Sequence, residues 1–158
     1  AGGRDLLNAG GVFPDLEVKD DTLTLAERDL LRIAGEQEVP LGLKLAEFSF
    51  EVAKKLQAAE RAPSLDGESF DAFVATLVEA GLPEPALEAP GVRDWLNWRA
   101  RMTIAQRMDE IGREADFRME RDPVLREAVR LLSTATSQID LFRLVDEQVA
   151  RRGDSSES

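Results

Sequence analysis

The sequence predicts a mainly α-helical protein, with about six helices preceded by a short irregular β segment. From residue 22 onward, apolar residues recur at helical spacing, and Gly or Pro residues separate one such stretch from the next. Before residue 22, short apolar runs flank Gly10-Gly11 and Pro14, which favour a turn and interrupt any strand. We therefore expect a β arm over 1–21 and a helical domain over 22–153.

The first predicted helix has a clear start signal. Thr24 and Glu27 are spaced as a capping box, so the helix should begin at Thr24. Its buried stripe is expected to comprise Leu25, Leu30, Leu31 and Ile33-Ala34. Gly35 is placed to end it.

Further helices follow from the same spacing. Residues 82–91 contain three prolines and predict a loop. The fourth helix is long and should bury Ile111, and the fifth should begin at Asp122-Pro123, a favoured cap and first-turn pair. The expected ranges are about 40–59, 69–80, 92–119, from 122, and about 137–152.

The last predicted helix leads to the C-terminal end of the sequence. Ile139 and Phe142 fall on its expected buried face. Gly153 should end it, and the polar residues 154–158 are predicted to form a disordered tail.

Composition narrows the classes of function. The net charge of −11 and the pI near 4.5 argue against nucleic acid and anionic membrane surfaces as partners, because both require a basic face. The sequence has no Cys and no His, which excludes thiol nucleophiles, disulfides and a Ser-His-Asp triad. No apolar stretch reaches the ~18 residues of a membrane span. We predict no cofactor, no bound metal and no transmembrane segment.

Three sequence segments resemble the C-terminal region of the carboxyl-terminal processing peptidases, serine peptidase family S41. The first is Gly3-Arg4 followed by GGVFPD over 10–15 and Val18, similar to the end of the protease core. The others, DTLTLAE over 21–27 and DPVL over 122–125, resemble the entry and a late helix of the helical C-terminal region. Asn8-Ala9 and Val12 depart from the family pattern, which has glycines and isoleucine there.

The resemblance implies what this chain would and would not carry. In that family the nucleophilic Ser, its Lys base and the PDZ domain lie upstream of the Gly-Arg segment, so this chain would have no catalytic residues of its own. The first residue, Ala1, is not Met, which predicts a processed product or a fragment. The family is extracytoplasmic, so a periplasmic location is implied.

These inferences favour a non-catalytic protein-interaction or structural module over an enzyme. One form of it would be an extrinsic subunit bracing a periplasmic membrane-protein complex. The alternative is a supporting or regulatory C-terminal part of an active S41 peptidase, with the missing protease core as partner. An independent small enzyme is the least favoured, since Ser49 and the nearby Lys residues share one helix without forming a pocket.

Candidate interaction residues fall into two groups. Trp95 and Trp98 are three apart, so both indoles should lie on one helix side, either in the core or as anchors for a partner. Arg99 would suit the polar rim of such an anchor site. The second group comprises Arg4, Leu6, Leu7, Val12 and Phe13 of the β arm, whose strand edges could pair with another protein.

Overall fold

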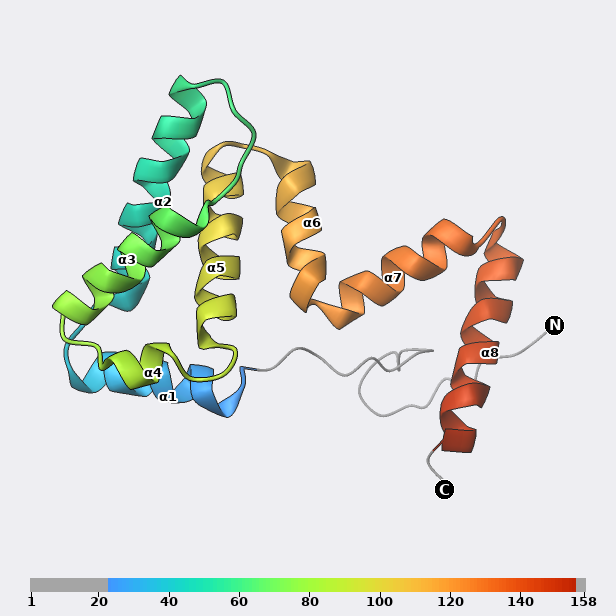
Figure 1. Cartoon of the computed structure of the whole chain (residues 1–158). Coiled ribbons are helices and arrows are strands. Elements are labelled where there is room, and N and C mark those ends of the chain that lie inside the picture. Colours follow the sequence, from blue (N-terminus) through green and yellow to red (C-terminus); the bar gives the residue numbers. More distant parts are fainter. Residues whose placement is uncertain (1–22, 156–158) are drawn as a thin grey trace, which may run out of the picture. The chain divides into compact units, whose positions relative to one another are not determined.

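The protein is mainly α-helical, as predicted. The computed structural model describes the backbone of residues 23–155 and the side chains of residues 23–147. Every regular element in this described part is a helix (Figure 1). The predicted β arm over 1–21 lies outside the described residues. The helices are α1 (Leu25–Glu36), α2 (Leu41–Ala58), α3 (Gly67–Glu79), α4 (Glu84–Leu87), α5 (Val92–Arg107), α6 (Ile111–Arg121), α7 (Pro123–Thr134) and α8 (Gln138–Ser155).

The described helices belong to two compact units. Helices α1 to α6 form the larger unit, which ends at Arg121. Helices α7 and α8 belong to the second unit.

The start of α1 follows the predicted capping box. The Thr24 hydroxyl accepts a hydrogen bond from the Glu27 backbone N–H at 3.2 Å, and the Glu27 carboxylate accepts one from the Thr24 N–H at 2.9 Å. The prediction that Leu25 is buried is wrong, because this side chain is 79% exposed. Helix α1 buries Leu30 and Ala34 instead, and Leu25 is about 180° around the helix from Ala34.

The core of the larger unit forms where α2 lies along α5. These two helices make the most extensive contact in the unit, α3 crosses α2, and α1 and α4 lie at the lower end of the pair in Figure 1. Small side chains at Ser49 and Ala53 of α2 and at Ala100 of α5 are buried, which lets the helix axes approach closely. Larger fully buried side chains fill the remaining volume: Leu30, Leu77, Leu82, Leu87, Val92, Leu96 and Ile104.

The predicted long helix over 92–119 is two helices. Helix α5 ends at Arg107, and α6 begins at Ile111 after a turn in which Asp109 has a φ of 60°. That left-handed residue breaks the helical phase, because a continuous α-helix requires negative φ. Ile111 therefore leaves the expected buried face and is exposed.

Two smaller differences concern the middle of the chain. The predicted loop over 82–91 contains the short helix α4. Helix α3 begins at Gly67, earlier than the predicted Ser69, because the Asp66 carboxylate caps the Ser69 backbone N–H at 2.8 Å.

The second unit begins as predicted and ends differently. Asp122 caps α7 by accepting a hydrogen bond from the Leu125 backbone N–H at 2.7 Å, with Pro123 in the first turn. Helix α8 continues through Gly153 to Ser155, so the predicted end at Gly153 is wrong; a single glycine is tolerated inside a helix at a cost of about 1 kcal/mol. Ile139 and Phe142 of α8 are both exposed, contrary to their expected burial.

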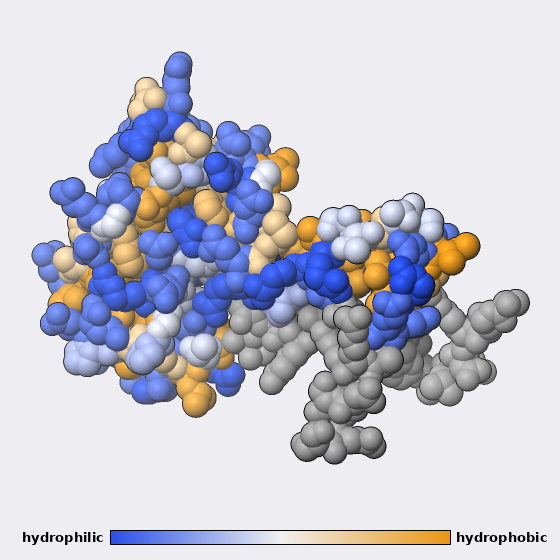
Figure 2. Space-filling view, turned by 45° about the vertical axis from the view of Figure 1, so that its right-hand side comes forward, coloured by the Kyte–Doolittle hydropathy of each residue, from blue (hydrophilic) through white to orange (hydrophobic). Residues whose placement is uncertain are grey.

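Polar residues cover most of the surface visible in the space-filling view. Blue hydrophilic residues dominate the face shown in Figure 2, and orange apolar residues reach the surface between them. Among the described helices, none combines the length and the hydropathy that crossing a bilayer requires.

Candidate functional site

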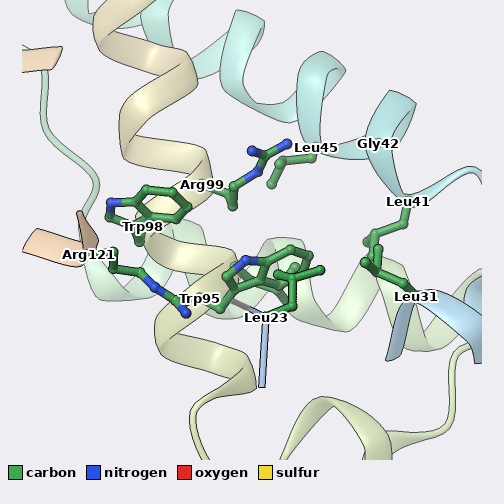
Figure 3. A pocket seen from close by; sticks show the side chains of 10 residues that line it. Leu23, Leu31, Leu41, Gly42, Leu45, Trp95, Trp98, Arg99 and Arg121 are labelled. Atoms are coloured by element: carbon green, nitrogen blue, oxygen red, sulfur yellow. The ribbon is translucent and has the colours of Figure 1, made fainter. Parts of the chain in front are cut away.

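An open groove in the larger unit is lined by leucines from three regions of the chain. Its volume is about 320 Å³. Leu23 lies just before α1 and Leu31 lies within it, and α2 and α5 supply the rest of the apolar wall (Figure 3). The leucines of the wall are Leu23, Leu31, Leu41, Leu45 and Leu96.

Both tryptophans of the chain line this groove, at different depths. Trp95 belongs to the hydrophobic core and is 7% exposed, so its indole forms part of the groove floor. Trp98, one turn further along α5, packs on the edge of the core and is half-buried. The two indoles thus share one side of the helix, as their spacing predicted, and only Trp98 presents a substantial surface to a partner.

The Trp98 indole is held in a fixed orientation by α6. Its Nε1–H donates a hydrogen bond to the Phe117 backbone carbonyl at 2.6 Å. The guanidinium carbon of Arg121 lies 5.3 Å from the centre of the indole ring, within the range of a cation–π interaction. An aromatic side chain ordered in this way loses little conformational entropy when a ligand packs against it.

Arg121 in turn pairs with a buried carboxylate. Its two terminal nitrogens lie 2.8 and 3.2 Å from the two oxygens of Glu27, and Glu27 is 1% exposed. Burial alone would raise the pKa of Glu27. The hydrogen bonds from Arg121 and the Thr24 backbone outweigh burial and hold that pKa below its ordinary value of 4.5.

Arg99 lies at the rim of the groove. It is exposed, and its side chain projects from α5 on the side of Leu45 and Gly42 (Figure 3). Within the part of the chain that the structure describes, the guanidinium makes no ion pair and no hydrogen bond. The groove therefore combines an apolar floor, the ordered indole of Trp98 and the guanidinium of Arg99, which pairs with no described residue.

The structure brings together part of the predicted interaction set. Trp95, Trp98 and Arg99 line one groove, whereas the predicted residues Arg4, Leu6, Leu7, Val12 and Phe13 lie outside the described residues. Sequence reasoning did not place Leu31, Gly42 or Arg121 at such a site. It predicted Leu31 in the buried stripe of the first helix, which is wrong, because this side chain is 41% exposed. The only local signal for Arg121 was its place just before the Asp122-Pro123 helix start, which marks a helix end but says nothing of its partner.

Ser49 lacks the surroundings of a catalytic serine. Its hydroxyl is fully buried between helices and has no hydrogen-bond partner among the described residues, so no base lies beside it there. A serine nucleophile requires a base within hydrogen-bond reach. No group of three or more acidic side chains that could hold a metal ion occurs in the described part either.

Comparisons with protein-family models, with curated proteins and with solved structures find no match for this chain. The resemblance to the C-terminal region of the S41 peptidases therefore stays a prediction that depends on the sequence segments alone.

Proposed function

We propose that this chain is a non-catalytic protein-interaction module that docks a partner protein through the groove beside Trp98. The observation that carries the proposal is the ordered, half-buried indole at the edge of an open apolar groove. Binding energy at protein interfaces concentrates in a few residues, and Trp and Arg are enriched among them. Trp98 and Arg99 supply these two types side by side.

The exposure of the groove wall supports the same proposal. Leu31 is 41% exposed although it lies beside the core. A partner side chain seated against Leu31 and Trp98 would remove apolar surface from water, a gain of about 25 cal/mol per Å² before the costs of association.

The resemblance to family S41 supports a more specific form of the proposal. A module derived from the C-terminal domain of such a peptidase, placed in the periplasm, would serve as an extrinsic subunit bracing a membrane-protein complex. The alternative is that the same groove contacts the protease core of an active S41 peptidase and supports it. In both forms the peptidase nucleophile and base lie elsewhere, which is consistent with the inaccessible Ser49 hydroxyl.

Gly42 offers a test that leaves both tryptophans in place. It lines the groove near the start of α2, and a Cβ atom added there meets nothing within 4 Å. The variant Gly42→Leu should fill part of the groove without disturbing the core. Gly35→Leu is the matched control, because Gly35 also lies in a helix with open space around it but outside the groove.

The experiment uses a photo-reactive benzophenone amino acid in place of Leu31, with the same group in place of Leu43 as the reference. Leu43 is 57% exposed and lies outside the groove wall. We expect one discrete adduct from Leu31 in periplasmic extract, abolished by Gly42→Leu and kept by Gly35→Leu. Mass spectrometry of the adduct identifies a membrane-complex subunit or a protease core. Equal adducts from both positions, or adducts insensitive to Gly42→Leu, would contradict docking in the groove.

A further inference from the structure

Arg99 distinguishes this groove from a purely apolar one. None of the ten described residues that line the groove is acidic, and two of them, Arg99 and Arg121, are cationic. Arg121 is engaged by Glu27, whereas Arg99 has no ion-pair or hydrogen-bond partner among the described residues. The chain as a whole carries a net charge of −11, so this rim is locally positive on an acidic protein.

The size of the groove limits what it can hold. A volume of about 320 Å³ lies at the lower end of the ~300–1,000 Å³ range of ligand pockets. Such a space takes a few side chains and not a whole partner helix. The occupant is therefore a short apolar part of a larger binding surface, with the rest of the partner outside the groove.

We propose that the groove receives a short segment of a partner protein whose apolar side chains lie against Trp98 and Leu31 and whose Asp or Glu carboxylate pairs with Arg99. This inference rests on the proposed docking function and names the chemistry of its partner. The guanidinium can bind a carboxylate through two parallel hydrogen bonds, a geometry that lysine cannot reproduce. A partner segment seated against the apolar wall beside Arg99 would shield that contact from water, which strengthens the charged hydrogen bonds.

A peptide selection tests the inference and does not require the natural partner. Random linear peptides displayed on phage are selected on the full chain and, in parallel, on its Arg99→Gln variant. Binders are assigned to the groove by their loss on Gly42→Leu and their retention on Gly35→Leu. We expect groove binders of the wild-type chain to combine Leu, Ile or Phe with an acidic residue at a fixed spacing. The acidic preference should vanish on Arg99→Gln while the apolar preference remains.

A single selected peptide then gives the size of the effect. Its Glu→Gln twin should bind the wild-type chain about tenfold more weakly by calorimetry, and both should bind Arg99→Gln equally. Arg99→Lys should recover only part of the difference, and added KCl should weaken the acidic peptide alone. Arg113→Gln is the control, because Arg113 is an exposed arginine of α6 that does not line the groove.

The outcomes separate this inference from the docking function beneath it. Groove binders without any acidic preference, or an acidic preference that persists on Arg99→Gln, would overturn the role of Arg99 and leave docking intact. Selected binders that are all insensitive to Gly42→Leu would overturn both proposals.

Discussion

Arg121 at the end of α6 donates hydrogen bonds from both of its terminal nitrogens to the two carboxylate oxygens of Glu27 in the first turn of α1, at 2.8 and 3.2 Å. The two residues are 94 positions apart in the sequence, and their pair fixes the start of α1 against the α5–α6 hairpin. The same Glu27 carboxylate caps the Thr24 backbone N–H, and the same guanidinium covers Trp98. One ion pair thus supports a helix start and a wall of the groove.

Breaking this pair from either side should destabilise the larger unit. We expect Glu27→Gln and Arg121→Met each to lower the free energy of unfolding by about 2–3 kcal/mol, because the first removes the charge that Arg121 binds and the second leaves the buried Glu27 carboxylate without this cation. The double variant should cost less than the sum of the two, with a coupling energy of about 1–2 kcal/mol. Urea unfolding followed by circular dichroism gives the free energy of unfolding of the wild-type protein, the two single variants and the double variant. Additive losses would show that the pair is not energetically coupled.

Protonation of Glu27 at low pH should account for part of the loss in the free energy of unfolding. Since the folded state lowers the pKa of Glu27 below 4.5, ionised Glu27 adds to the free energy of unfolding above that pH. The contribution is lost as the pH falls from about 4.5 through the folded-state pKa. Asp66 and Asp140 also have lowered pKa values, and both remain in Glu27→Gln. The free energy of unfolding is therefore measured against pH for the wild-type protein and for Glu27→Gln, and the difference between the two curves reports Glu27. Parallel curves from pH 7 down to about 3 would contradict this assignment.

Ser49 should be replaceable by alanine without loss. Its fully buried hydroxyl lacks a hydrogen-bond partner among the described residues, so Ser49→Ala should be neutral or stabilise the fold by up to about 1 kcal/mol. Ser49→Val should destabilise it by about 1–3 kcal/mol, because the larger side chain meets α5 at close approach. Thermal unfolding of the three chains checks the order. A marked loss in Ser49→Ala would point to a role for the hydroxyl.

Replacing Gly35 and Gly81 by alanine should change the free energy of unfolding in opposite directions. Gly35 lies in α1 with open space around it, so Gly35→Ala should raise the free energy of unfolding by about 0.5–1 kcal/mol. Gly81 follows α3 with a φ of +107°, a conformation that alanine adopts only under strain. Gly81→Ala should therefore cost about 1 kcal/mol or more, and equal effects in denaturant titrations would contradict the backbone argument.

Trp95 and Trp98 should separate into a core residue and a docking residue. Trp95→Ala should cost about 3–5 kcal/mol of stability, since it empties a buried position. Trp98→Ala should leave the larger unit folded and weaken a groove-binding peptide by about 2 kcal/mol or more. Denaturant unfolding and calorimetry on the same two variants measure both quantities, and similar stability losses from both would assign Trp98 to the core as well.

The sequence predicted the helix starts that depend on residues close together in the chain. The capping box at Thr24 and the cap at Asp122 involve groups within a few residues, so the sequence reveals them directly. The break at Asp109 has no such signal. Neither Gly nor Pro stands between Arg107 and Ile111, and the break follows from how α6 folds back on α5.

The groove also has features that the sequence predicts and features that depend on tertiary packing. The shared side of Trp95 and Trp98 follows from helix periodicity alone. Leu31 and Gly42 reach the groove because α1 and α2 pack beside α5, which is a tertiary arrangement that no pattern within either segment specifies. Burial of Glu27 is unexpected from sequence for a related reason, since carboxylates are buried only with a partner, and this partner is distant along the chain.

The two indoles of the groove are also the main chromophores of the protein, because the sequence has two Trp and no Tyr. The indole absorption band and the indole emission of the chain therefore originate at one place, beside Leu31 and Arg99. A ligand entering the groove, or loss of the Arg121 cation from the face of Trp98, would alter the emission directly, without any attached dye. The chain thus carries its own optical reporter at the groove where we propose that a partner binds.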